Sequence, residues 1–335
     1  MRLKLSDMSG ITTAALFTTL QEQDMEAAAL ELFRYQYQEN ALYRAYTDAL
    51  HRRPSDVRSL QQIPFLPIQF FKTHTVTCGT FTPELVFESS GTTQTINSRH
   101  LVKEAAIYER SFLAGFERTY GPVSDFVVLG LLPSYLERRH SSLVYMVQDM
   151  VKRSGHAASG FYLYEHDKLA DHLRELEASG QKTLLIGVTF GLLDFAEHHS
   201  LQLENTIVME TGGMKGRREE WTRQQVHDYL RERLGCKHIH AEYGMTELLS
   251  QAYSKGEGLF TSPPWMKVLV RDENDPFQLS VSNASGVINV VDLANVYSCA
   301  FIATEDIGRL HSEGSFEVLG RLDNSALRGC SLMVS

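Results

Sequence analysis

The sequence predicts an α/β protein with a mainly parallel central sheet and an antiparallel β-rich region near its carboxyl end. The strand-like apolar runs are residues 125–132, 182–190, 205–209 and 238–243. The helical stretches between them are residues 141–152, 168–178 and 217–234. Short strands that alternate with helices of this length are typical of βαβ units and a parallel sheet. From residue 265 onward, short alternating runs separated by turn residues predict antiparallel strands instead.

This pattern divides the chain into a helical segment at 1–62, an α/β core at 63–264 and a β-rich subdomain at 265–335. The first segment is rich in Ala, Glu and Leu, and its aromatic residues are expected to pack in a core. Two prolines bracket the apolar run at 63–74, which favours an extended, buried connector. Ligands of parallel sheets bind beyond the carboxyl ends of the strands, so the loops there are the expected site.

Composition excludes several classes of protein. Hydrophobic residues make up 43% and charged residues 22% of 335 residues, which excludes a disordered chain. A net charge of −9 argues against a nucleic-acid partner. We find no signal peptide and no run near the ~20 apolar residues of a membrane span. Four scattered cysteines without zinc-type spacing predict reduced thiols, and with them a cytoplasmic location.

The segment FESSGTTQ at residues 87–94 is the strongest local signal for chemistry. Hydroxyls and backbone N–H groups around a glycine can surround phosphate oxygens. The residues expected to do this are Ser89, Ser90, Gly91, Thr92 and Thr93. An ordinary polar turn has the same composition and stays open as the alternative. The lysine of a Walker P-loop is absent, and no GxGxxG motif predicts a dinucleotide site.

A second signal, EYGMTE at residues 242–247, directly follows a predicted strand. Glu247 can hold Mg²⁺, which prefers oxygen ligands. Thr246 can donate to a phosphate oxygen, and Tyr243 can stack on a base. The alternative is a simple helix N-cap, with Thr before Glu.

Two further signals lie in the β-rich region. Asp306, in TEDIG, can accept the hydroxyls of a ribose, as acidic residues do in nucleotide sites. Arg321, in GRLD, can reach a phosphate or ribose. Taken alone, each is equally an ordinary turn or hairpin residue.

The four segments in this order resemble the ANL superfamily of adenylate-forming enzymes. Within it the sequence most resembles the acyl-protein synthetase (LuxE-type) family, related to phenylacetate–CoA ligases. The finer match lies in ESSGTT with Ser98, Arg99 and His100, and in LLPSYLERRHSSLVYMV, METGGMKGRREE, EYGMTELLSQAYS and GRLDNSALRGCSLM. The resemblance covers about residues 63–333, and it implies an ANL-type N-terminal adenylation fold.

The resemblance also implies which residues bind ATP and Mg²⁺. Ser89 to Thr93 would surround the phosphates, together with Thr246, and Glu247 would hold Mg²⁺. Gly212 and Gly213 would let adenine approach the backbone, and Tyr243 would stack on it. Gly244 would also belong to the cofactor-binding residues. Asp306 would bind the ribose, with Arg321 nearby. A carboxylic acid, expected to be a fatty acid, would attack the α-phosphate to give an acyl-adenylate and pyrophosphate.

Cys330, in RGCS, is the expected acyl acceptor, because the family carries a cysteine near its carboxyl end that forms a thioester. Arg328 beside it would favour the reactive thiolate, whereas an inert buried thiol is the alternative. The acyl group would pass to a partner acyl reductase or acyl carrier protein. The sequence stops soon after Asp323, so we expect no small C-terminal lid domain of the kind that carries a catalytic lysine in the superfamily.

Two other functions remain open from the sequence. An ATP-independent acyltransferase would load Cys330 from an acyl carrier protein or CoA. A non-catalytic subunit would keep the scaffold to dock a partner and would not bind ATP.

Overall fold

The structure of the chain is a computed structural model that describes residues 16–17, 20–89, 96–133, 138–212, 221–273 and 275–322. It divides into two compact units. Unit 1 comprises Met1–Ser111, Thr246–Ser250 and Thr261–Ser335, and unit 2 comprises Phe112–Met245 and Gln251–Phe260. The chain therefore passes from unit 2 to unit 1 inside the EYGMTE segment, between Met245 and Thr246.

Unit 2 contains the predicted parallel sheet, with the strand order β5-β4-β6-β7-β8. Its parallel strands are β4 (Val127–Leu131), β5 (Gly160–Phe161), β6 (Thr183–Gly187), β7 (Thr206–Glu210) and β8 (Ile239–Tyr243). The antiparallel β9 (Ala252–Ser254) and then β10 (Leu259–Thr261) continue the strand order beyond β8. The apolar runs VVLGL of β4 and TLLIG of β6 are buried throughout, because helices cover both faces of these strands.

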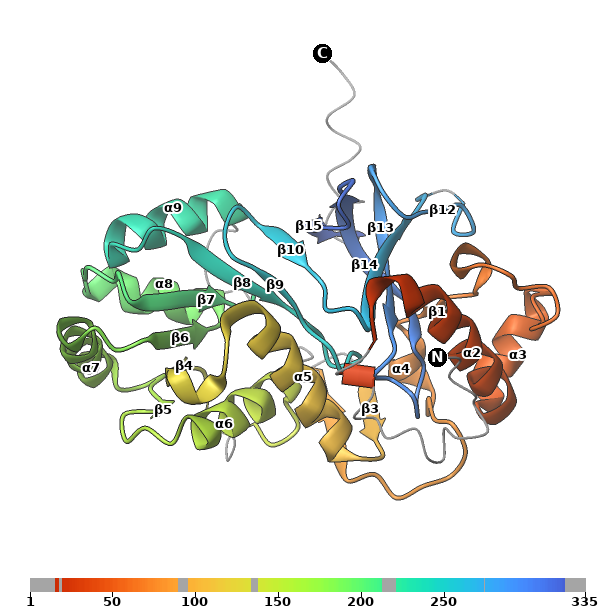
Figure 1. Ribbon diagram of the computed structural model, residues 1–335, viewed down its shortest axis with the longest axis horizontal. Helices are drawn as coiled ribbons and strands as arrows, with labels where there is room; N and C mark the ends of the chain where they lie inside the picture. The colour runs from red at the N-terminus through yellow and green to blue at the C-terminus, as the bar shows by residue number, and fades with distance from the viewer. Residues whose placement is uncertain are drawn as a thin grey trace, which may run out of the picture. The chain divides into compact units, whose positions relative to one another are not determined.

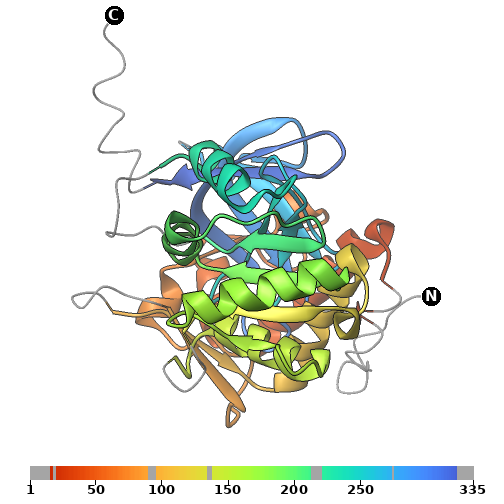
Figure 2. The same ribbon diagram turned by 90° about the vertical axis from the view of Figure 1, so that its left-hand side faces the viewer.

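The helices of unit 2 are α6 (Ser142–Ser154), α7 (His166–Ser179), α8 (Thr189–His198) and α9 (Arg223–Leu234), with the second half of α5 (Ala105–Tyr120). Figures 1 and 2 show helices on both faces of the strands. The apolar sides of α7, α8 and α9 share one core with Leu129, Leu185 and Val208. These strand residues alternate in sequence with others that face the opposite side, where Figure 1 places α6.

Local signals explain where these helices begin and end. Thr222 and Gln225 form a capping box, so α9 begins at Arg223 rather than at the predicted residue 217. Residues 217–220 of that predicted stretch lie outside the described residues. The helix ends at Gly235, which adopts the left-handed conformation with φ of 62°.

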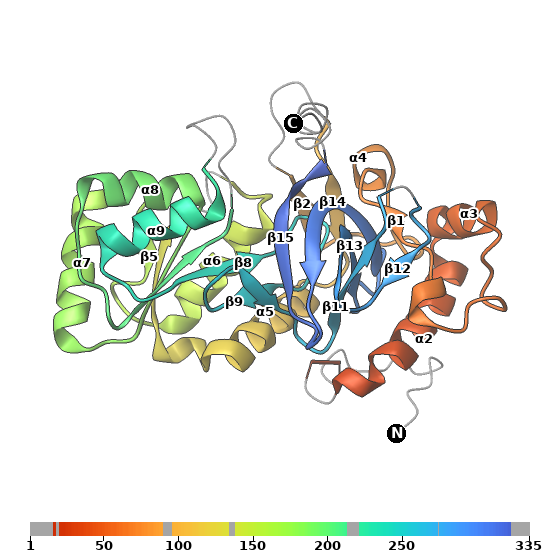
Figure 3. The same cartoon turned by 90° about the horizontal axis from the view of Figure 1, so that it is seen from above.

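Unit 1 contains the predicted antiparallel region. Its strands are β11 (Met266–Arg271), β12 (Leu279–Ser280), β13 (Ala284–Asp292), β14 (Phe301–Leu310) and β15 (Phe316–Arg321). Figure 3 shows β11, β13, β14 and β15 side by side, and their pairings are antiparallel. A separate hairpin joins β2 (Leu85–Glu88) to β3 (Arg99–Val102).

The predicted extended connector at 63–74 is only partly extended. Its first half forms β1 (Leu66–Pro67), which pairs in parallel with β14, and its second half forms the short helix α4 (Phe70–Thr73). Ile68 still donates its N–H to the carbonyl of Ala303, which ties the start of α4 to β14. This pairing is long-range, so local sequence gives no sign of it.

The amino-terminal helices α2 (Met25–Glu39) and α3 (Ala41–Ala49) belong to unit 1 and hold the loop between β13 and β14. Gln36 is fully buried and donates to the carbonyl of Asn295 at 2.7 Å and to that of Val296 at 3.1 Å. Asn40 donates to the carbonyl of Ser298 at 3.0 Å while it caps α3. Phe33 and Tyr43 pack on Phe301, as expected for core aromatics.

We also searched the helices of the described ranges for a possible membrane span. Not one of them combines the length and the apolar character that crossing a bilayer requires.

Candidate functional site

The β2–β3 hairpin of unit 1 holds both ends of the predicted phosphate-binding loop. The N–H of Ser89 donates to the carbonyl of Ser98 at 3.1 Å, and the N–H of Ser98 donates to Oγ of Ser89 at 2.9 Å. Ser90, Gly91, Thr92 and Thr93, which lie between these residues, are outside the described residues. The two hydrogen bonds between Ser89 and Ser98 therefore hold the two strands of the hairpin together at the base of the predicted phosphate-binding loop.

Glu247 lies next to this hairpin and is only 5% exposed. Burial raises the pKa of its carboxyl group, and a hydrogen bond with Ser98 and the charges of Arg321 and Lys72 only partly offset that rise. Lys72 comes from α4 and Arg321 from the end of β15. The hairpin thus contributes a hydrogen-bonding hydroxyl to this buried carboxyl group, and the charges of one cation on α4 and one on β15 also act on it.

His100 fixes the backbone of the segment that carries Thr246 and Glu247. Its Nδ1 is 2.9 Å from the carbonyl oxygen of Thr246, and its Nε2 is 3.1 Å from Oγ of Ser298. A carbonyl oxygen only accepts, so Nδ1 carries the proton and Nε2 accepts from the serine hydroxyl. Burial lowers the pKa of His100 to about 4, which keeps the ring neutral at pH 7. His100 is therefore a structural support of the site and not a proton carrier near pH 7.

Asp306 and Arg321 face each other on neighbouring strands of unit 1. They are register partners on β14 and β15, and Nε of Arg321 lies 3.0 Å from Oδ1 of Asp306. Asp306 is 7% exposed, and its N–H donates to Oγ1 of Thr304 at 3.1 Å. The guanidinium that forms this pair also acts on Glu247, so both carboxylates share one cation.

The predicted adenine residues belong to unit 2 and follow neighbouring parallel strands. Gly212 follows β7, and Tyr243 is the last residue of β8. Glu210 and Ala241 are register partners, so both strands end at the same edge of the sheet. The Tyr243 ring is buried and packs edge-on against Phe260, with centroids 6.0 Å apart. Gly213 is outside the described residues.

Glu242 precedes Tyr243 and is a partly buried carboxyl group beside Gly244. Its Oε1 lies where a Cβ at position 244 would come, so a side chain there would require the Glu242 carboxyl group to move. Burial, and secondarily the charge of Glu210, raise the pKa of Glu242 to about 8.

We expect Glu242→Gln to raise the melting temperature more at pH 8 than at about pH 5. Between the ordinary pKa of 4.5 and about 8, the folded protein holds a proton that the unfolded chain lacks, so stability falls as the pH rises. Gln does not ionise, so the variant lacks this dependence of stability on pH. Thermal unfolding of wild type and variant at both pH values measures the difference. Glu177→Gln is the control. The pKa of Glu177 is lowered, so this carboxyl group is ionised at both pH values, and its substitution should change the melting temperature equally at both. An equal rise in melting temperature at the two pH values for Glu242→Gln would contradict the prediction.

Unit 1 brings together five predicted site residues: Ser89, Thr246, Glu247, Asp306 and Arg321. Unit 2 contains Gly212, Tyr243 and Gly244. Cys330 is outside the described residues. Sequence reasoning gave no role to Lys72, Ser98 or His100, because each acquires its partner only through long-range packing. Within the described ranges, no group of three or more His, Cys, Asp or Glu side chains could hold a metal ion.

The family model "Acyl-protein synthetase, LuxE" matches residues 13–335 of the chain. Among solved structures, ATP-bound MatB from Rhodopseudomonas palustris is 18% identical, with a TM-score of 0.51 over 72% of this chain and 49% of MatB. A 2-hydroxyisobutyryl-CoA ligase in complex with 2-HIB-AMP and CoA is 13% identical, with a TM-score of 0.63 over 91% of this chain and 70% of the ligase. The chain thus spans about half the length of MatB. No curated protein matches it. These similarities show the adenylate-forming fold that the sequence predicts.

Proposed function

Because the chain belongs to the acyl-protein synthetase family, we propose that it activates a carboxylic acid with ATP and transfers the acyl group to a protein thiol. The acid is proposed to be a fatty acid. The proposal rests chiefly on the surroundings of Glu247 in unit 1. Its buried carboxyl group lies next to the hairpin of the predicted phosphate loop, and His100 of the same hairpin binds the carbonyl of the preceding residue, Thr246. The similar structures of ATP-bound MatB and of the 2-hydroxyisobutyryl-CoA ligase with 2-HIB-AMP support the proposed chemistry.

In the first step a carboxylate oxygen of the acid attacks the α-phosphorus of ATP. A new O–P bond forms, the bond between the α-phosphorus and the bridging oxygen breaks, and pyrophosphate leaves with the electron pair. Both reactants are negative, so their approach is opposed electrostatically. Lys72 and Arg321 supply positive charge in unit 1, and the hydroxyls of the 89–93 loop supply hydrogen-bond donors. Groups placed in advance in this way lower the barrier because they need little reorganisation.

The residues present fit a Mg²⁺ ion that is held mainly by the nucleotide. Mg²⁺ is usually bound through one or two carboxylates together with substrate phosphates and water, so no cluster of protein ligands is required. Glu247 is the carboxylate proposed to hold it. Burial disfavours the ionised form of Glu247, so an additional positive charge beside this group would stabilise that form. When bound, Mg²⁺ would neutralise phosphate charge.

Asp306 is proposed to accept the ribose hydroxyls, with Arg321 orienting its carboxylate. Tyr243, Gly212, Gly213 and Gly244 are proposed to contact the adenine. Thr246 is proposed to donate its hydroxyl to a phosphate, while its carbonyl stays bound to His100.

In the second step a thiolate attacks the acyl carbon of the adenylate. A C–S bond forms, the bond from that carbon to the phosphate oxygen breaks, and AMP leaves. The described thiols are poorly suited to this role, because Cys78, Cys236 and Cys299 are all buried. Burial raises the pKa of Cys236 to about 11 and that of Cys299 to about 12, which disfavours the nucleophilic thiolate. Cys330 is therefore the proposed acceptor in this chain, and a thiol of a partner acyl reductase or acyl carrier protein is the other candidate.

Wild type incubated with Mg·ATP and mixed free fatty acids is expected to gain an acyl mass, and Cys330→Ser is not. The reason is that only a reactive, accessible thiol keeps the acyl group as a thioester. Intact-protein mass spectrometry measures this, with Cys236→Ser as the matched control that keeps the adduct. Samples without ATP complete the set.

Free acyl-AMP without an adduct would keep the activation step and move the acceptor to a partner. Labelling from an acyl-thioester without ATP would overturn the proposal in favour of an acyltransferase. The absence of both an adduct and acyl-AMP would contradict it as well.

A further inference from the structure

Glu210 is a buried carboxylate at the carboxyl end of β7, the strand that leads into the proposed adenine residues. It is the last residue of the strand and only 5% exposed. A buried charge is costly unless hydrogen bonds and opposite charges compensate it. The contacts that compensate the charge of Glu210 therefore show which parts of unit 2 this carboxylate holds in place.

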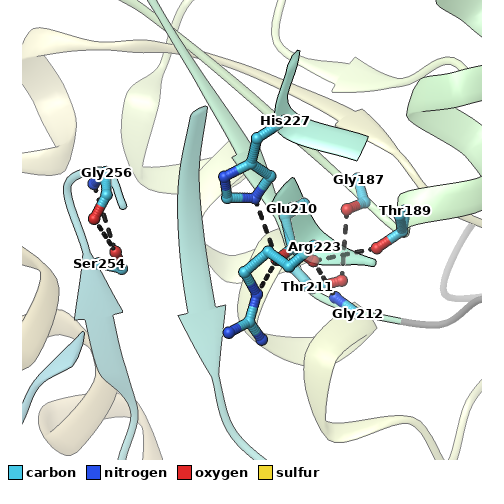
Figure 4. A network of polar contacts seen from close by, with 9 residues as sticks. All are labelled: Gly187, Thr189, Glu210, Thr211, Gly212, Arg223, His227, Ser254 and Gly256. Carbon is cyan, nitrogen blue, oxygen red and sulfur yellow. Dashed lines mark hydrogen bonds and ion pairs between the residues drawn. The ribbon is translucent and has the colours of Figure 1, made fainter. Parts of the chain in front are cut away.

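The two carboxylate oxygens of Glu210 have different partners, as Figure 4 shows. Oε2 accepts from Oγ1 of Thr189 at 3.0 Å and from the N–H of Gly212 at 2.6 Å. Oε1 lies 3.5 Å from Nε of Arg223 and 3.6 Å from Nε2 of His227. Burial alone would raise the pKa of Glu210, but His227, Arg223 and the Gly212 N–H outweigh it and lower the pKa. The carboxylate is thus held ionised inside unit 2.

The first set of partners fixes the turn after β7. Gly212 has a φ of +75°, a conformation that side chains rarely adopt. Its N–H is bound by Glu210, and its carbonyl accepts from the N–H of Thr189 at 3.0 Å. A Cβ added at Gly212 would meet no atom within 4 Å. Glu210 and Thr189 therefore fix both the N–H and the carbonyl of Gly212.

The second set of partners leads from Glu210 to Tyr243. Arg223, which pairs with Glu210, lies over the ring of Phe260 at 5.3 Å from its centroid. Phe260 in turn packs against Tyr243. One carboxylate thus contacts the Gly212 turn directly and reaches Tyr243 through two side chains, all within unit 2.

We propose that Glu210 is a positioning residue for the nucleotide base: it sets the backbone of Gly212 and, through Arg223 and Phe260, the ring of Tyr243. The proposal rests on the proposed function, since it assumes that ATP is bound. It goes further in naming a residue that acts through others and is not itself expected to touch the base.

Gln at position 210 tests the role of the charge with little change in shape. Its amide oxygen can accept from Thr189 and Gly212, but its NH₂ group would then face the guanidinium of Arg223, which only donates. Gln therefore cannot accept from Gly212 and from Arg223 together and also lacks the charge that pairs with Arg223. Thr189→Val removes one hydrogen bond and keeps the charge, and it serves as a second, milder variant.

Glu177 offers a matched control at the other end of the same strand. Its carboxylate accepts from the backbone N–H groups of Glu204 and Asn205 and from Oγ1 of Thr206, where β7 begins. Glu177→Gln therefore weakens a loop anchored by a carboxylate, as Glu210→Gln does, but far along the strand from Gly212.

The experiment is calorimetric titration of full-length wild type, E210Q, T189V and E177Q with Mg·ATP and Mg·GTP, together with their melting temperatures. We expect E210Q to raise the Kd for ATP about tenfold, the loss that corresponds to one charge-assisted hydrogen bond. The Kd for GTP should rise less, so the preference for ATP should narrow. T189V should shift the Kd in the same direction by about threefold, and E177Q should lower the melting temperature without changing either Kd.

Wild-type ATP affinity in E210Q or T189V would overturn the proposal while leaving the proposed function intact. So would an equal loss of affinity in E177Q, because it would show a general loss of stability. Failure of the wild type itself to bind ATP would overturn the proposed function, and the role of Glu210 with it.

Discussion

Glu247→Gln is expected to lower ATP–pyrophosphate exchange by at least about 100-fold, because it removes the charge that would hold Mg²⁺ against the phosphates. Gln is nearly the same size and can still pair with Ser98, so the fold should survive. Exchange of labelled pyrophosphate into ATP, with a panel of straight-chain fatty acids and aryl acids, measures the loss.

Glu317→Gln is the matched control for this experiment. Glu317 also lies in unit 1, but it pairs with His311 at 2.9 Å, away from the group around Glu247. It should keep wild-type exchange. A folded Glu247→Gln protein with wild-type exchange would show that this carboxylate is not part of the reaction. Absence of exchange in the wild type with the whole panel would count against activation of an acid.

Glu247→Gln should lower kcat more than it weakens the affinity for ATP. Lys72 and Arg321 remain in the variant, so much of the charge that attracts ATP is kept. A group that acts mainly in the transition state lowers kcat and kcat/KM together. A rise in the KM for ATP with unchanged kcat would instead assign Glu247 to ground-state binding alone.

Asp292→Ala is expected to destabilise the protein by about 3 kcal/mol or more, since several buried donors would each lose a partner worth about 1–3 kcal/mol. The carboxylate of Asp292 is fully buried at the end of β13. It accepts from the N–H of Leu249 at 2.7 Å, the N–H of Ser250 at 3.1 Å and Oγ of Ser250 at 2.6 Å. Chemical denaturation monitored by circular dichroism measures the change in the free energy of unfolding.

Asp228→Ala is the control, because Asp228 is exposed on α9 and its loss should cost less than about 0.5 kcal/mol. Asp292→Asn keeps one acceptor oxygen, so its loss of unfolding free energy should lie between those of Asp292→Ala and Asp228→Ala. An unfolding free energy within about 0.5 kcal/mol of wild type for Asp292→Ala would contradict the prediction. Because Asp292 anchors Leu249 and Ser250 just after Glu247, the variant should also weaken exchange at temperatures where it is still folded.

Glu247 and Asp292 have different roles in the same site. Glu247 is proposed to act on the reactants, whereas Asp292, Asn295 and His100 hold its segment in place. Asn295 donates to the carbonyl of Glu247 at 2.8 Å, and His100 is bound to the carbonyl of Thr246. The segment 246–250 has few regular backbone partners, so buried side chains from two other parts of unit 1 replace them, namely β3 and the end of β13 with the loop after it.

Local patterns in the sequence are enough to predict the fold class. Apolar runs such as VVLGL and TLLIG are long enough to predict strands buried on both faces, and the periodic stretches between them predict helices. The alternating runs after residue 265 predict antiparallel strands for the same reason. The order of the nucleotide-type segments indicated the superfamily, and finer motifs such as METGGMKGRREE indicated the family, since neither signal depends on contacts.

Which side chains come into contact depends on the tertiary structure. Lys72 is 175 residues from Glu247 along the sequence, and no local pattern indicates that its charge acts on that carboxyl group. Burial and partners distant in sequence decide three further features. These are the parallel pairing of β1 with β14, the neutral state of His100 and the hydrogen bond from the N–H of Gly212 to the buried Glu210. Burial sets the pKa values, and long-range packing sets the partners; neither is encoded in a short stretch of residues.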